Sequence, residues 1–269
     1  MQSSASRPDG RMIYKVEGAG PAILFIQGVG MHATSWRPQI DAFRASHCCV
    51  TFEHRGLGGS DAAVGRVSIE GMADDALAVL NAAGVDAVHV VGHSLGGVVA
   101  QQLALSHRVR VRSLSLLCTF PAGRRAAPLS WRMIWLGLRS QVGTRAMRRR
   151  GFLRLVMPPG RIENEAELAA RLAELFGHDL GEQPKVVPAQ LRALRRSDLC
   201  ARLPELAGLP TLVVSAFHDP IAPPALGREL AKRIAGARYV EVGDASHGMP
   251  ISHAGVVNGA LAAHLADAS

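Results

Sequence analysis

A serine at position 94 lies within a short pattern that suits nucleophilic chemistry. Residues 92–96 read G-H-S-L-G, after a valine-rich run at 88–91 and before helix-compatible sequence at 98–100. A strand that passes through a tight turn into a helix exposes the serine hydroxyl at its apex, and flanking glycines let strand and helix approach closely. Serine alone is a weak nucleophile, so this interpretation requires a base and an orienting acid elsewhere in the chain.

Two polar loops further along the chain could supply these groups. Asp219 follows the apolar run at 211–214, and His247 follows the run at 239–242. If both runs are parallel strands of the sheet that leads to Ser94, all three side chains emerge at the same carboxyl edge. The sequence therefore predicts a catalytic triad with His247 as the base and Asp219 as the acid.

Other residues compete for both roles. The chain has 11 histidines, most of which must be structural or on the surface. His93, beside the nucleophile in a tight turn, is expected to point elsewhere and make a structural hydrogen bond. Asp244 is too near His247 along the loop to be its acid, and Asp198 falls in a predicted helix.

The elements that would position these residues follow an alternating pattern. Strands and helices alternate from 12 to 119, which predicts right-handed crossovers and a mostly parallel sheet with helices on both faces. Residues 120–204 contain helical stretches, such as 131–140, and no convincing strand. We therefore predict an α/β core from residues 1–119 and 205–269, with the segment between them inserted as a helical cap.

Two further glycine-rich loops complete a recognisable set of motifs. Residues 27–30, Q-G-V-G, resemble the H-G-x-G oxyanion loop of the α/β-hydrolase superfamily of serine hydrolases, and residues 54–60, H-R-G-L-G-G-S, resemble its R-G-x-G-x-S loop. With the loops that carry Ser94, Asp219 and His247, the resemblance covers nearly the whole chain. Within the superfamily, the chain looks most similar to small bacterial esterases, enol-lactone hydrolases and C–C bond hydrolases with a helical cap.

The resemblance implies roles for several more residues. The backbone N–H groups of Val29 and Leu95 would form the oxyanion hole. Gln27 stands where the family commonly has histidine, and since the hole uses backbone groups, this change is expected to alter only hydrogen bonds within the loop. Four side chains are candidates for lining the substrate pocket: His32, Trp131, Trp135 and Met249.

The implied activity is hydrolysis of a carboxylic ester or lactone of a small substrate through an acyl-enzyme on Ser94. Three other functions fit the same residues: a C–C bond hydrolase, a cofactor-free perhydrolase or acyltransferase, and a ligand receptor. Haloalkane dehalogenases and epoxide hydrolases are disfavoured, because they place aspartate at this position. Nucleotide binding is not expected, because neither a complete G-x-G-x-x-G motif nor G-K-[ST] occurs.

Composition and charge limit the expected partners. The 269 residues carry a net charge of +8, but 13 arginines and no acidic residue lie within residues 87–162, so the excess is regional. This region lacks a nucleic-acid-binding pattern, which favours a solvated basic surface over an anionic partner. The expected partner is a small-molecule ester or lactone substrate, with no nucleic acid. The four cysteines show no metal spacing, and we predict no metal or cofactor. Without a membrane-spanning run or signal sequence, a cytoplasmic protein is expected. The sequence does not indicate an oligomeric state.

Overall fold

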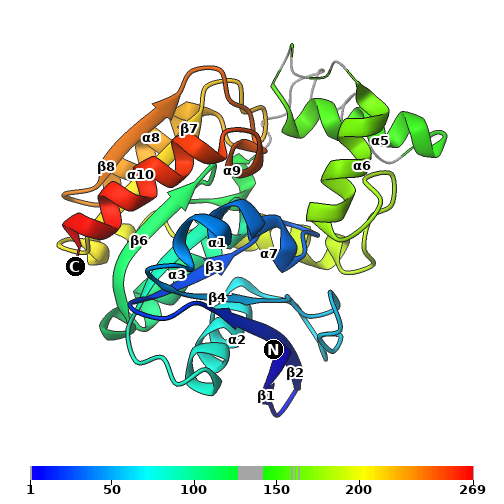
Figure 1. The fold of residues 1–269 in the computed structure, drawn as a ribbon. Coiled ribbons are helices and arrows are strands. Elements are labelled where there is room, and N and C mark those ends of the chain that lie inside the picture. Colours follow the sequence, from blue (N-terminus) through cyan, green and yellow to red (C-terminus); the bar gives the residue numbers. More distant parts are fainter. Residues whose placement is uncertain (1, 127–141, 159, 161, 163, 269) are drawn as a thin grey trace.

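A central sheet of eight strands organises the protein (Figure 1). The computed structural model describes residues 2–126, 142–158, 160, 162 and 164–268. The strands are β1 (Gln2–Arg7), β2 (Gly10–Glu17), β3 (Ala22–Ile26), β4 (Cys48–Phe52), β5 (Val88–His93), β6 (Val111–Leu117), β7 (Thr211–Ala216) and β8 (Arg238–Val242). Their order is β1-β2-β4-β3-β5-β6-β7-β8, with β3 to β8 parallel and the β1–β2 hairpin antiparallel at one edge. This is the mostly parallel sheet predicted from the sequence.

Helices cover both faces of the sheet and divide its core into two clusters. One face packs against α2 (Ile69–Ala82), α3 (Leu95–Ser106) and α8 (Pro224–Arg233), and the other against α1 (Arg37–Phe43), α9 (Met249–Ser252) and α10 (Ala254–Asp267). In β3, Leu24 and Ile26 face the first set of helices, whereas Ile23 and Phe25 face the second. Strands buried on both faces are apolar throughout, which explains why their sequences stand out. None of the helices in the described ranges is long and apolar enough to cross a membrane.

The first strand, β1, was not predicted from the sequence. Its described side chains are polar except Ala5, which is buried and pairs with Met12 on β2. Arg7 ends the strand with an ion pair of 2.9 Å to Asp75 on α2. An edge strand with a single apolar side chain has no periodic signal, so only its pairing with β2 reveals it.

A helical cap lies between β6 and β7 in the sequence, and Figure 1 shows residues 145–176 of this cap away from the sheet. Its helices within the described residues are α5 (Arg145–Val156), α6 (Glu165–Phe176) and α7 (Val187–Arg196). The Asn164 side chain caps α6 by accepting a hydrogen bond from the Glu167 N–H. The apolar faces of α5 and α6 pack together with Met31, which belongs to a loop of the core. The predicted helix at 131–140 lies outside the described residues.

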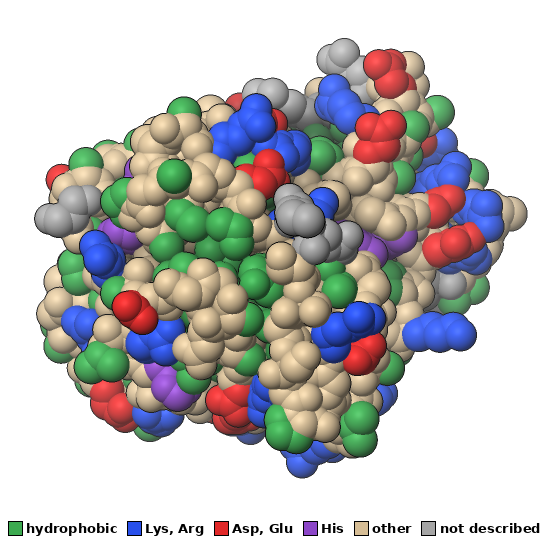
Figure 2. All heavy atoms as spheres, turned by 60° about the horizontal axis from the view of Figure 1, so that its bottom comes forward, with side chains coloured by type: hydrophobic (Ala, Val, Ile, Leu, Met, Phe, Trp, Pro, Cys, Tyr) green, Lys and Arg blue, Asp and Glu red, His purple; other side chains and the backbone are tan. Residues whose placement is uncertain are grey.

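Many arginines of the basic region lie beside acidic side chains. On α5, Arg149 pairs with Asp179 and Arg150 pairs with Glu165. On the face drawn in Figure 2, the described basic and acidic side chains are interspersed rather than gathered into one basic patch. This arrangement agrees with a solvated surface, on which water and salt screen such pairs.

Candidate active site

Ser94 occupies the tight turn between β5 and α3. Its backbone angles are φ 54° and ψ −118°, a region that residues other than glycine rarely adopt. The neighbouring glycines are required sterically: a Cβ at Gly96 would lie 2.0 Å from the carbonyl oxygen of Ile26, and one at Gly92 would lie 2.4 Å from that of Gly96. The turn thus holds the Ser94 side chain at the carboxyl edge of the sheet.

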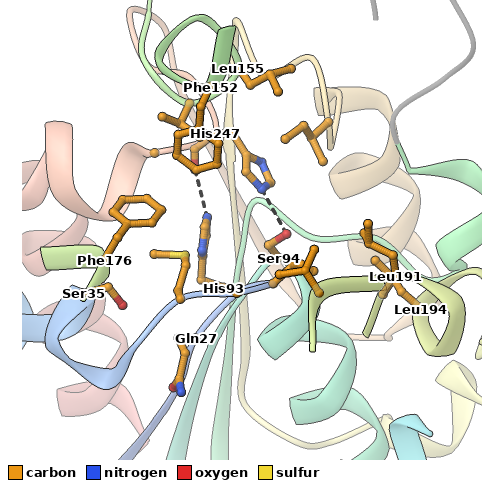
Figure 3. Close-up of a pocket in the computed structure, with 18 of the residues that line it drawn as sticks. Gln27, Ser35, His93, Ser94, Phe152, Leu155, Phe176, Leu191, Leu194 and His247 are labelled. Atoms are coloured by element: carbon orange, nitrogen blue, oxygen red, sulfur yellow. Dashed lines mark hydrogen bonds between the residues drawn. The ribbon is translucent and has the colours of Figure 1, made fainter. Parts of the chain in front are cut away.

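The structure brings the three predicted catalytic side chains together. Nε2 of His247 lies 3.0 Å from Oγ of Ser94, and Nδ1 of His247 lies 2.7 Å from Oδ2 of Asp219. Figure 3 shows the imidazole of His247 directed at the Ser94 hydroxyl. Asp219 follows β7 and His247 follows β8, so parallel pairing delivers both loops to the same edge as the serine.

The carboxyl group of Asp219 is held in its charged form. Burial by itself would raise its pKa, but the positive charge and hydrogen bond of His247 and the backbone N–H groups of Ala222 and Ile221 keep the pKa below its usual range. Both of these N–H groups donate to Oδ1 at 2.8 Å. A carboxylate at Nδ1 fixes the proton on that nitrogen, which leaves Nε2 free to accept the proton of the serine.

The two competing carboxylates lie elsewhere. Asp198 pairs with Arg124 at 3.2 Å on the surface. The Asp244 side chain is 68% exposed and lies 3.1 Å from His253. Of the three candidate acids, Asp219 is therefore the one whose carboxylate lies within hydrogen-bond distance of His247.

His93 supports the base rather than replacing it. Its Nε2 donates a hydrogen bond to the backbone carbonyl of His247 at 2.9 Å, which confirms the expected structural hydrogen bond (Figure 3). Burial, with the nearby charge of His247, lowers the pKa of His93 to about 3. The ring is therefore neutral and adds no positive charge beside the base.

The predicted oxyanion loop follows β3. Val29 lines the cavity above Ser94, and Leu95 is the first residue of α3, where a backbone N–H has no acceptor within the helix. Nε2 of Gln27 donates to the carbonyl of Phe52 at 2.8 Å, and its side chain is fully buried. The glutamine side chain thus ties the start of the loop to the end of β4.

A cavity of about 970 Å³ opens above Ser94 between the sheet and the cap. Its walls are mainly apolar, and Figure 3 shows several of the lining side chains around the serine. The cap contributes many of the apolar lining residues, among them Phe152, Leu155, Val156, Phe176, Leu191 and Leu194. The site can therefore hold a small organic molecule with apolar groups against a serine nucleophile.

The pocket residues predicted from the sequence fit this cavity poorly. Met249 is fully buried in the core beside α10 and is not among the lining residues, which corrects that prediction. His32 also lies outside the cavity wall, with Nδ1 3.6 Å from the Glu53 carboxylate. Trp131 and Trp135 lie outside the described residues.

Comparison with known proteins decides the family. The chain matches the α/β-hydrolase fold family over residues 21–254. The chain belongs to the α/β-hydrolase family. A relative from Azorhizobium caulinodans, whose name describes a carbamate hydrolase (RutD), is 34% identical over 89% of both chains. Rhodomycin D methylesterase DauP of a Streptomyces strain is 32% identical over 92% of this chain and 93% of its own.

Solved structures agree with this assignment. The enol-lactonase of Burkholderia xenovorans has a TM-score of 0.79 and 28% identity, and covers 98% of this chain and 100% of its own. A hydrolase from Pseudomonas aeruginosa has a TM-score of 0.82 and 25% identity, and covers 98% of both chains. Family and relatives together identify this α/β-hydrolase as a hydrolytic enzyme, as the sequence motifs implied.

One buried group of side chains in this α/β-hydrolase meets the spacing of a metal site. Ligand atoms of His93, Cys118 and His247 lie within 4.8 Å of one another. However, the two ring nitrogens of His247 already face Ser94 and Asp219. Burial also raises the pKa of the Cys118 thiol well above its usual value, so the sulfur stays protonated. The described residues thus suit a hydrogen-bonded triad better than a metal ion.

The cap residues that line the cavity were not singled out from the sequence. Leu191 and Leu194 on α7 and Phe176 on α6 are apolar positions of amphipathic helices, and such a face predicts burial without saying what it covers. The amphipathic helical pattern at 165–176 and 189–195 was the sequence signal that these side chains are buried. That they face the cavity above Ser94 follows only from the position of the cap in the structure.

Proposed function

We propose that this α/β-hydrolase is a serine hydrolase that cleaves a carboxylic ester or lactone of a small substrate through an acyl-enzyme on Ser94. The observation that carries the proposal is the continuous hydrogen-bonded chain from Asp219 through His247 to Ser94. This chain ends at a strained turn, where the serine faces a cavity. Such an arrangement activates a hydroxyl as a nucleophile.

The geometry supports a two-step reaction. Oγ of Ser94 forms a bond to the carbonyl carbon while its proton passes to Nε2 of His247, and Asp219 stabilises the resulting imidazolium. The N–H groups of Val29 and Leu95 bind the oxyanion of the tetrahedral intermediate, a contribution of about 3–4 kcal/mol per donor. The imidazolium then returns the proton to the leaving alkoxide as the acyl-enzyme forms. A water molecule, deprotonated by His247, hydrolyses the acyl-enzyme and restores the serine.

The cavity favours a substrate with an apolar body. Half of the cap residues that line it are leucine, valine or phenylalanine, with polar side chains such as Arg124 and Arg195 among the others. Each methylene group buried there contributes about 0.8 kcal/mol to binding. We therefore expect activity to increase with acyl chain length until the chain fills the cavity.

The names of the relatives support acyl chemistry and suggest one alternative substrate. A methylesterase and an enol-lactonase are similar to this chain, and both names describe cleavage at an ester carbonyl. The name carbamate hydrolase, carried by several relatives, describes cleavage at a carbonyl that also bears nitrogen. A carbamate is therefore the second candidate substrate, to be processed by the same residues.

The test combines covalent labelling with turnover. A fluorophosphonate probe should add once to the wild-type chain, as seen by intact mass, and should not add to Ser94→Ala. Ser115→Ala is a matched control, because this buried hydroxyl has no hydrogen-bond partner among the described residues. It should label as the wild type does. The same proteins are then assayed on p-nitrophenyl esters of increasing acyl length, a lactone and an aryl carbamate.

Each outcome separates the candidate functions. Labelling together with turnover of an ester or lactone supports the proposal. If the aryl carbamate is hydrolysed faster than the esters and the lactone, a carbamate is the preferred substrate of the same residues. Labelling without turnover of any of these would favour the other functions implied by the resemblance: a C–C bond hydrolase, an acyltransferase or perhydrolase, or a ligand receptor. Equal labelling of Ser94→Ala and wild type would overturn the nucleophile assignment.

A further inference from the structure

Cap residues hold both polar backbone groups of Gly30, in the loop that carries Val29. The N–H of Gly30 donates to Oε1 of Gln190 at 2.9 Å, and its carbonyl accepts a hydrogen bond from Nε2 of His178 at 3.1 Å. Gln190 and His178 lie 160 and 148 residues further along the chain, both in the cap. The cap therefore makes direct contact with the backbone of the oxyanion loop.

The loop from Gly28 to Met31 has the geometry of a type II turn. The N–H of Met31 points back to the carbonyl of Gly28 at 3.4 Å, and Gly30 has a φ of +69°. A positive φ at the third residue distinguishes a type II from a type I turn, in which the central peptide faces the opposite way. That central peptide joins Val29 to Gly30. Because Gln190 accepts a hydrogen bond from the N–H of this peptide, it stabilises the type II turn over the type I turn.

The environment of Gln190 indicates that the hydrogen bond to Gly30, and not packing alone, accounts for a glutamine at this position. The side chain is 1% exposed, and its Nε2 has no hydrogen-bond partner among the described residues. Burying an unpaired amide N–H is unfavourable, so an apolar side chain would suit the site better if only packing mattered. Val187, earlier on α7, packs so closely that a Cβ at Gly30 would lie 2.8 Å from its Cγ2. Helix α7 thus holds the turn both sterically and by hydrogen bonding.

We propose that Gln190 is a positioning residue for the oxyanion hole. By accepting the Gly30 N–H, it fixes the loop on the C-terminal side of Val29 and so holds the Val29 backbone in place, with its N–H available to the carbonyl oxygen of a substrate at Ser94; this role rests on the function proposed above. Leu191, the next residue on α7, lines the cavity. Substrate that packs on α7 therefore steadies the helix that holds the oxyanion loop, which couples recognition in the cap to stabilisation of the transition state.

The test removes the acceptor and measures transition-state binding per active site. Gln190→Met keeps the length of the side chain but cannot accept the hydrogen bond, and Gln190→Asn keeps the amide but cannot reach Gly30. Gln102→Met is the control, because this buried glutamine donates its hydrogen bond to Ser106 within α3, away from the oxyanion loop. Active sites are counted with the fluorophosphonate, and circular dichroism establishes folding. For each protein we measure kcat, KM, and the affinities of an alkylboronic acid and of the carboxylate product.

The expected pattern separates positioning from a purely structural role. Both Gln190 variants should lose about 10- to 100-fold in kcat per labelled serine, less than the roughly 10²- to 10³-fold that follows complete removal of an oxyanion donor, because the N–H of Val29 is displaced but still present. Boronic acid affinity should fall by the same factor, because its adduct places a tetrahedral oxygen in the hole. KM and product affinity should change less than twofold, and Gln102→Met should match the wild type. A merely structural role would lower the number of labelled sites and leave kcat per site unchanged.

Two results would overturn the inference without touching the proposed function. One is a labelled, active Gln190→Met whose kcat per site and boronic acid affinity equal those of Gln102→Met. The other is equal weakening of product and boronic acid, which would make Gln190 a substrate-binding residue. If Gln190→Met does not fold, Gln190→Asn decides by the same measurements. Failure of the proposed function itself would appear differently, as a wild type that neither labels nor turns over.

Discussion

Nε2 of His93 donates a hydrogen bond to the backbone carbonyl of His247, 2.9 Å away, so the residue beside Ser94 anchors the loop that carries His247. The two rings lie close, with centroids 4.9 Å apart. Because His93 is neutral and fully buried, it fixes the distance between Ser94 and His247 without competing for the proton.

Replacing His93 with leucine should therefore reduce both activity and stability. The carbonyl of His247 would lose its buried partner, at a cost of about 1–3 kcal/mol in the free energy of unfolding. We expect kcat to fall about tenfold as the imidazole moves, since 1.4 kcal/mol of lost transition-state stabilisation corresponds to that factor. Urea denaturation and ester hydrolysis measure the two effects. His107→Leu, on the surface, should change neither, and an unaltered His93→Leu enzyme would contradict the anchoring role.

Asp219→Asn should remove most of the activity while the fold persists. An amide at this position no longer fixes the proton on Nδ1 of His247, and the corresponding change in serine proteases lowers kcat about 10⁴-fold. Steady-state kinetics on the best ester substrate measures the loss. Asp198→Asn is the matched control, because its carboxylate faces Arg124 instead. A larger loss in Asp198→Asn than in Asp219→Asn would reassign the acid.

The buried carboxyl of Glu53 should make stability depend on pH. Burial raises its pKa from 4.5 to about 7, although the N–H of Ala33 opposes the shift. Because the folded pKa exceeds the unfolded one, stability is full below pH 4.5 and declines as pH rises to about 7, with a total change on the order of 3 kcal/mol.

Glu53→Gln isolates this effect, because the amide oxygen can still accept the hydrogen bond from Ala33. Urea unfolding at pH 5 and pH 8 should show that the wild type loses more stability between these values than Glu53→Gln does. Identical pH dependence in the two proteins would mean that Glu53 is ionised throughout this range.

Gly96→Ala should prevent assembly of the elbow. The new methyl group would lie 2.0 Å from the carbonyl oxygen of Ile26, and this backbone atom cannot yield without moving β3. We expect the soluble yield or the melting temperature to drop sharply. Gly259→Ala on α10 meets no atom within 4 Å and should instead stabilise its helix by about 1 kcal/mol. Equal stability of the two variants would contradict the steric account of the turn.

Several features of the fold and site follow from local sequence because their physical causes are local. A strand buried on both faces is mainly apolar, so β3 is visible as a continuous apolar run and β5, β6 and β7 as runs centred on valine or leucine. The turn at Ser94 needs glycine on both sides, and chain direction places the loops after β7 and β8 at the same edge. Together these rules predicted the parallel sheet and the three residues of the proposed triad.

Other features depend on contacts between distant segments and were decided only by the tertiary structure. The polar strand β1 is defined by its pairing with β2, and Met249 turns into the core although its neighbours Gly248 and Pro250 line the cavity. The contact of Gln190 with Gly30 spans 160 residues and has no sequence pattern. Periodicity shows that a side chain is buried but not what it is buried against, because the partner is chosen by packing of the whole chain. The sequence by itself thus determined the strand, turn and helix that carry Ser94, whereas the tertiary structure decided which residues surround it.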